Sequence, residues 1–256
     1  MTAFHQSIHC HRKSTFISLL GAGADPKIKC STWSIKETSI DMETTSLRLV
    51  AQQGDPDLFF TNHLLEYDLE IDAVDFYGIT PFTFAMTEGN LHIANALLKR
   101  GADINKRTGV RGSKPEHQQS VLAKILQRDC ILVVNRLKYL VSNLEDVDPG
   151  LARHGPAADF MVEESRSALH VLLGVNKGRE DAAFRTCLDI LLKAFPLPSQ
   201  LDFLDNEGRT PLDIAASHGN ETAVKALLFA GATEHKLDLP GSLCKQFQDF
   251  GLQGLS

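Results

Sequence analysis

The amino-terminal segment contains the residues best suited to metal chemistry. His5, His9, Cys10 and His11 lie close together, and imidazole and thiolate groups are common ligands of zinc. His5 and His9 are four residues apart, a spacing that places both on one face of a helix. No CxxC pair follows in the sequence to complete a closed zinc site. We therefore expect these side chains to be ordinary surface and packing residues, and we predict no metal and no cofactor.

Signatures of catalysis are weak elsewhere in the chain. Gly21 and Gly23 resemble part of a phosphate loop, but the Lys-Ser/Thr pair of a P-loop is missing. Neither a G-x-S-x-G elbow nor an H-E-x-x-H pair occurs. Carboxylates gather at Glu163-Glu164 and at Asp68, Glu70 and Asp72, in loop-like segments without an apolar neighbourhood that would raise a pKa. We therefore predict no catalytic residues and no enzymatic activity.

Composition and net charge limit the classes of partner that the chain is expected to bind. The 256 residues are 43% hydrophobic, which is enough for a sizeable core, and the net charge is −6, which does not favour binding to nucleic acid. No apolar run approaches the length of a membrane span. Five widely scattered cysteines and a polar amino end indicate reduced thiols and an intracellular protein, either cytoplasmic or nuclear. We expect a monomer that binds neither nucleic acid nor membrane.

One sequence pattern occurs twice in the chain, and it predicts the scaffold that positions these residues. Residues 75–105 contain the pattern D-x-x-G-x-T-P, then E-G-N, then A-L-L-x-x-G-A. Residues 205–233 repeat this pattern at the same spacing, with H-G-N in place of E-G-N. Self-similarity of this kind is typical of proteins built from stacked repeats.

The residue types in the pattern predict a pair of antiparallel helices. Thr80 and Thr210 can cap the free amides of a first helix, and the proline after each suits the first helical position. Gly89 and Gly219 can adopt the positive φ that ends this helix, and a second helix with a Leu-Leu pair follows. Such a hairpin cannot bury its apolar face alone, so each one has to stack on a neighbour.

At these residues the sequence resembles the ankyrin repeat, whose signature is T-P-L-H-x-A-A, then G-N or G-H, then L-L-x-x-G-A-D-x-N. The resemblance implies an all-α solenoid of helix-turn-helix units joined by hairpin fingers, with degenerate units and insertions. It also implies that His5 and His170, at the histidine of T-P-L-H, help to hold neighbouring units together by hydrogen bonds. We expect one ankyrin-repeat domain over 1–256, with units at 1–27, 40–72, 73–105, 117–146, 163–197 and 205–233 and a capping tail at 234–256.

The first unit has no finger or cap in front of it, which leaves one apolar face of the stack uncovered. Three interpretations stay open. Phe4, Ile8, Phe16 and Ile17 adapt as a cap, the unit frays, or the chain is a fragment of a longer array.

A stacked array exposes its fingers and its first helices, and these positions predict the binding surface. Phe76, Tyr77 and Ile79 are large apolar finger residues, and exposed aromatic clusters tend to mark protein contacts. Packing of these three residues against the loop after Lys106 is the alternative. The full set of predicted partner-binding residues is Phe76, Tyr77, Ile79, Thr87, Glu88, Asn206, Glu207, Arg209, Ser217 and His218.

The resemblance therefore implies a non-enzymatic adaptor or scaffold that binds a protein partner through its finger tips and concave first-helix face. Two alternatives remain open. One is an accessory or catalytic protein whose insertions, chiefly 146–166 and 174–181, close over a pocket. The other is a targeting fragment of a larger ankyrin protein.

Overall fold

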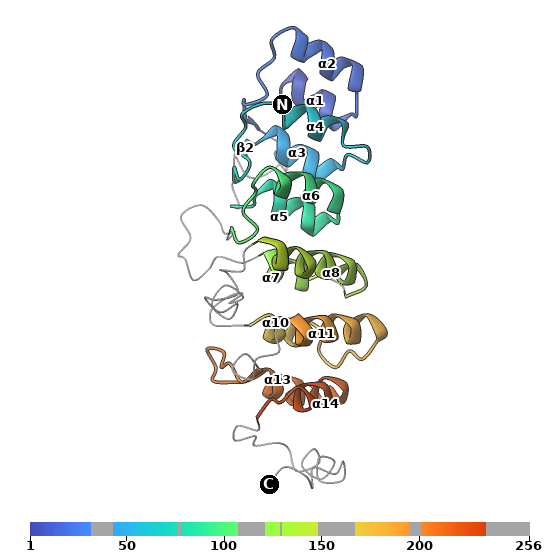
Figure 1. Cartoon of the computed structure of the whole chain (residues 1–256), viewed down its shortest axis with the longest axis vertical. Helices are drawn as coiled ribbons and strands as arrows, with labels where there is room; N and C mark the ends of the chain where they lie inside the picture. Colours follow the sequence, from blue (N-terminus) through green and yellow to red (C-terminus); the bar gives the residue numbers. More distant parts are fainter. Residues whose placement is uncertain are drawn as a thin grey trace, which may run out of the picture. The chain divides into compact units, whose positions relative to one another are not determined.

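A computed structural model describes residues 1–31, 43–75, 78–106, 121–128, 130–147, 167–194 and 201–233. The chain forms two compact units, Met1–Ile125 and Leu126–Ser256. The first unit contains α1 (Ala3–His9), α2 (Lys13–Gly21), α3 (Ser46–Gln53), α4 (Phe59–Leu64), α5 (Pro81–Glu88) and α6 (Leu91–Lys99), and α7 (Val121–Leu126) begins at its end. The second contains α8 (Cys130–Val147), α10 (Ala168–Val175), α11 (Ala182–Ala194), α13 (Pro211–Ser217) and α14 (Glu221–Phe229). The helices lie in antiparallel pairs in each unit (Figure 1).

A hydroxyl side chain begins the first helix of five pairs. In each case it accepts a hydrogen bond from the backbone amide three residues later, which satisfies one of the free donors of the first turn. The prolines after two of these caps occupy the first helical position, as the sequence predicts. Gly89 then ends α5 in the left-handed conformation, with φ of 85°. The five caps are Thr2, Thr45, Thr80, Ser167 and Thr210.

Neighbouring pairs stack through both of their helices. In the first unit α3 contacts both α1 and α5, and in the second unit α10 contacts α13 while α11 contacts α8 and α14. The faces that meet are apolar, and the largest fully buried side chains include Phe16, Phe60, Phe82 and Phe184. Because each pair covers the apolar face of the next, the helices are stabilised by stacking rather than by their own short length.

The first helical pair does pack on its neighbour. Phe4, Ile8 and Phe16 are buried, whereas Ile17 remains exposed. The Phe16 ring lies 5.0 Å from the ring of Phe4 and 5.0 Å from that of Phe60 on α4, measured between centroids. Three of the four residues considered as an amino-terminal cap therefore belong to the core between the first two pairs.

The predicted all-α class is confirmed, with one small addition. β1 (Cys30–Ser31) and β2 (Glu43–Thr44) form an antiparallel pair in which Cys30 lies opposite Thr44. β2 lies directly before α3 in the chain. Within the described ranges, no helix combines the length and the apolar character that crossing a membrane requires. The expected capping tail at 234–256, the loop after Lys106 and most of the predicted insertion at 146–166 lie outside the described residues.

Candidate functional site

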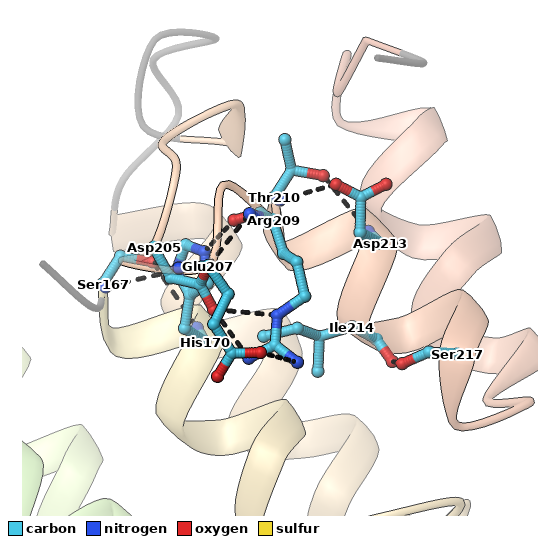
Figure 2. Close-up of polar contacts among 9 residues, drawn as sticks. All are labelled: Ser167, His170, Asp205, Glu207, Arg209, Thr210, Asp213, Ile214 and Ser217. Carbon is cyan, nitrogen blue, oxygen red and sulfur yellow. Dashed lines mark hydrogen bonds and ion pairs between the residues drawn. The ribbon is translucent and has the colours of Figure 1, made fainter. Parts of the chain in front are cut away.

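The finger before α13 is fixed by one buried carboxylate (Figure 2). Asp205 Oδ1 accepts hydrogen bonds from the backbone amides of Glu207 and Arg209, both at 2.9 Å. Asp205 Oδ2 accepts from Arg209 Nε at 3.1 Å and from Arg209 Nη2 at 2.9 Å. With the Asp205 side chain only 1% exposed, these four hydrogen bonds constrain the finger turn.

The hydrogen-bond donors around Asp205 favour the charged form of its carboxyl group. Burial acts to raise the pKa of the Asp205 carboxyl, but the hydrogen bonds from the Arg209 side chain and from the Arg209 and Glu207 amides together outweigh it and hold the pKa below its usual range. Arg209 also pairs with Glu207, through Nη1 and Oε2 at 2.9 Å. The Glu207 side chain is 59% exposed, so this outer contact is the weaker and more easily broken of the two.

A histidine joins this finger to the preceding helical pair. His170 Nδ1 accepts a hydrogen bond from the Ser167 amide at 3.2 Å, so the ring proton is on Nε2, which donates to the Arg209 carbonyl at 3.0 Å. In the first unit His5 plays the matching role, with Nε2 placed 3.3 Å from Ser46 Oγ. The expectation that His5 and His170 hold neighbouring repeats together by hydrogen bonds is confirmed.

The amino-terminal histidines and cysteine do not converge. His5 is buried, and burial lowers its pKa against a smaller opposing effect of a backbone hydrogen bond at Ile28, so the ring is disposed to stay neutral. Cys10 is an exposed free thiol, and His11 packs edge-on against Phe60 at 6.0 Å between ring centroids. Among the described residues, no group of three or more His, Cys, Asp or Glu side chains is arranged to hold a metal ion.

The described part of the finger before α5 shares one feature with the finger before α13. Asp75 Oδ1 accepts from the Ile79 amide at 2.9 Å, as Asp205 does from Arg209. Its other oxygen, Oδ2, accepts from Arg48 Nε at 2.8 Å, and the side chains of Arg48 and Asp75 are only 11% and 3% exposed. The Arg48 guanidinium also lies over the Phe84 ring, 4.6 Å from its centroid. The first unit therefore ties neighbouring pairs together with an ion pair.

The sequence prediction missed Arg48, although a signal was present. Thr45-Ser46-Leu47-Arg48 places the arginine at the position of the motif that His5 and His170 occupy. The substituted residue keeps the bridging function of that position, because it reaches the aspartate of the next finger instead of a backbone carbonyl.

The sequence-based expectation for the acidic residues at 68–72 was wrong for one of them. Asp72 is partly buried, and burial raises its pKa, aided by the nearby charge of Asp103. Asp72 also accepts the Asp103 amide, at 3.0 Å to Oδ2. Asp202 does the same for Thr233 in the second unit, at 2.7 Å. Asp72 is thus a structural link between neighbouring repeats.

The predicted partner-binding residues are divided between the two compact units and differ in exposure. In the second unit Asn206, Glu207 and Ser217 are exposed, and Arg209 and His218 are half-buried. In the first, Glu88 is exposed and Ile79 and Thr87 are half-buried, while Phe76 and Tyr77 lie outside the described residues. Thr87 and Ser217 are equivalent, since each donates its hydroxyl to the carbonyl three residues earlier, at 3.0 and 2.9 Å.

Arg209 and His218 meet at a pocket in the second unit. The pocket has a volume of about 290 Å³ and is open to solvent. Val171, Gly174 and Val175 of α10 and Ile214 of α13 supply its apolar part. Sequence reasoning named Arg209 and His218 but did not place them together. Gln127, His170 and Lys177 complete the lining, and Gly174, Val175 and Lys177 come from the predicted insertion at 174–181.

Comparison with known proteins decides the identity of the repeated pattern. The family model of the ankyrin repeat matches residues 77–109 and 207–238. The chain contains ankyrin repeats. Ankyrin repeats are general protein-interaction modules, and the fold is typically non-enzymatic.

Similar chains with solved structures have the same fold. An ankyrin repeat domain from Acinetobacter baumannii AYE superimposes with a TM-score of 0.61 at 18% identity, covering 90% of this chain and 98% of that one. A chain from the complex of a predatory endopeptidase from Bdellovibrio bacteriovorus with an immunity protein gives a TM-score of 0.60, with the same identity and coverage. These similarities establish the ankyrin-repeat solenoid fold.

The curated relatives are much longer than this chain. Human Inversin is 25% identical over 206 residues, in an alignment that covers 61% of this chain and 19% of Inversin. Dog (Canis lupus familiaris) Inversin is 26% identical over 206 residues, covering 61% of this chain and 18% of that protein. The match therefore spans less than a fifth of the length of either relative.

Proposed function

We propose that this chain is a non-enzymatic adaptor or scaffold that binds a protein partner through its finger tips and the exposed ends of its first helices. The observation that supports this most directly is the construction of the fingers. Asp75 and Asp205 each hold a finger turn by hydrogen bonds to its backbone, and the exposed side chains around Asp205 are thereby presented on a rigid support. Binding by a preformed surface avoids much of the entropy cost of ordering a loop.

Two further observations agree with this proposal. One of the similar solved chains comes from a complex between two proteins. The described groups that line the pocket of the second unit do not form an acid–base pair with a nucleophile, since His170 is held by Ser167 and the Arg209 carbonyl, and Arg209 by Asp205. The insertion at 174–181 does contribute to a cavity, through residues 174–177. The described residues that line this cavity do not include a nucleophile paired with a base, so the alternative of a catalytic pocket is not supported.

The first test concerns the aromatic finger residues. Replacing Phe76 and Tyr77 together by serine is expected to reduce the amount of partner captured from a cell extract by about tenfold or more, because single aromatic anchors in an interface often contribute about 2 kcal/mol. The measurement is affinity purification of the tagged full chain, with quantification of bound proteins by mass spectrometry.

The melting temperature of the double variant separates this proposal from its alternative. We expect it to stay close to that of the unmodified chain. A drop of about 5 °C or more, together with a loss of all bound proteins, would assign Phe76 and Tyr77 to packing. Phe229→Ser is the matched control, because the Phe229 side chain is 96% exposed and lies on the second helix α14.

A further inference from the structure

The pocket between α10 and α13 differs from the larger hollow of the first unit in its charge. The hollow in the first unit has a volume of about 410 Å³ and is lined by Lys27 and Lys29 together with Asp68 and Glu70. Of these, Lys27 and Asp68 already pair at 3.6 Å. By contrast, the charged and titratable side chains that line the second-unit pocket are all basic among the described residues, namely His170, Lys177, Arg209 and His218.

Two of these basic groups can still take a new partner. Within the described ranges no carboxylate pairs with Lys177, which is exposed. Arg209 uses Nε and Nη2 for the buried Asp205, while its Nη1 pairs, among the described residues, with the exposed Glu207. Figure 2 shows the Arg209 side chain extending from the finger toward Ile214, with the Glu207 carboxylate beside its outer end. A second carboxylate could replace Glu207 at this nitrogen without disturbing Asp205.

His218 also lines the pocket. Its Nδ1 is buried and has no hydrogen-bond partner among the described residues, although its ring lines the pocket. Native proteins rarely leave a buried nitrogen unpaired. Because this nitrogen is not accessible to solvent, His218 adds ring surface to the pocket wall but no donor or acceptor that is shown to reach an occupant.

The size and the apolar part of the pocket limit what can enter. A volume of about 290 Å³ lies near the lower end of the sizes typical for small-molecule sites, about 300–1,000 Å³, and it is large enough for one or two side chains. Val171 and Ile214 offer contact to methylene groups, and Val175 is 49% exposed at the same site. A glutamate side chain combines two methylene groups with a carboxylate.

We infer that this pocket binds a glutamate side chain within an acidic segment of a protein partner, with the carboxylate on Lys177 and Arg209 and the methylene groups against Val171 and Ile214. The inference rests on the proposed function and specifies the chemistry of its partner. Glu207 competes with the incoming carboxylate for Arg209 and so weakens the binding. A nucleic acid phosphate is a poorer fit, because the phosphate group lacks the methylene groups that Val171 and Ile214 would contact.

The test uses the full chain and a defined probe. A display library of random 12-residue peptides is selected on the immobilised protein, and the most enriched peptide is synthesised with a fluorescent label. We expect it to contain glutamate, and we expect its glutamine version to bind at least about fivefold more weakly by fluorescence anisotropy. Affinity should also fall as salt is raised, because exposed charges are screened.

Three variants assign the effect to the pocket. Lys177→Glu should weaken the labelled peptide at least about fivefold, and Glu207→Gln should strengthen it about threefold, because the competing carboxylate is gone. Lys193→Glu is the matched control, since Lys193 is an exposed lysine in the last turn of α11 and does not line the pocket. It should leave the affinity unchanged.

Several results would overturn the inference. These are enriched peptides without acidic residues, a peptide that is indifferent to Lys177→Glu, an affinity that falls in Glu207→Gln, or a library that yields no binder. None of these results refutes the proposed function, which is tested separately by affinity purification with the variant of Phe76 and Tyr77. If capture persists while the pocket variants have no effect, the adaptor role stands and the acidic partner is wrong.

Discussion

Replacing Asp75 by alanine is expected to lower the free energy of unfolding by about 3–5 kcal/mol, the loss typical of breaking a buried ion pair on one side. Arg48, only 11% exposed, would keep its charge but lose the acceptor of its Nε. The Ile79 amide would lose its partner in the finger turn as well. Urea unfolding followed by far-UV circular dichroism measures the change.

Two companion variants make the Asp75 result specific. Asp75→Asn retains a carbonyl oxygen for the Ile79 amide and loses only the charge, so we expect a smaller loss than for alanine. Asp68→Ala removes an aspartate whose side chain is fully exposed and 3.6 Å from Lys27, and should unfold at nearly the same urea concentration as the unmodified chain. Equal effects of Asp75→Ala and Asp68→Ala would refute the role assigned to Asp75.

A second large effect is expected at the centre of the second unit. Phe184 is fully buried on α11, which packs on α8, α10 and α14. Phe184→Ala leaves a cavity that these short helices cannot close, and we expect a loss of about 3–5 kcal/mol. Since repeats are stabilised mainly by their nearest neighbours, the loss should appear as faster amide hydrogen exchange in α10, α11 and α14, while α3 and α5 keep their protection.

Phe229→Ala provides the comparison for this prediction. It makes the same chemical change on the second helix of the next pair, at a side chain that is 96% exposed. Exchange in α10, α11 and α14 should then be nearly unchanged. If amide exchange accelerated equally in Phe184→Ala and Phe229→Ala, the assignment of Phe184 to the core and of Phe229 to the surface would be contradicted.

The parts of the fold that could be predicted from the sequence are those set by local chemistry. Thr80 and Thr210 cap their helices because a hydroxyl can accept a free amide of the first turn, and the proline that follows suits the first helical position. His5 and His170 occupy a motif position whose bond to the next repeat follows from the stacking itself. These local rules act at short range, so they can be seen in the order of the residues.

The parts that were missed depend on contacts between segments distant in the sequence. Arg48 reaches an aspartate 27 residues away, and its partner could not be chosen from spacing alone. Asp72 was expected to be solvated because it lies in a loop-like segment with two other acidic residues, yet it accepts a hydrogen bond from the amide of Asp103, 31 residues later. The pocket joins α10, the finger residue Arg209 and the end of α13, and this arrangement exists only after the pairs have stacked.

The most direct test of the central claim is site-specific photocrosslinking on the two helices of one ankyrin repeat. A photoreactive phenylalanine analogue is placed either at Ser217, exposed at the end of α13, or at Lys225, exposed on α14. The protein is then illuminated in a cell extract, and covalent adducts are identified by mass spectrometry. The account predicts a protein adduct at Ser217 and none at Lys225. An adduct at Lys225 with none at Ser217 would contradict it, because the partner would then bind the second helices instead of the fingers and first helices.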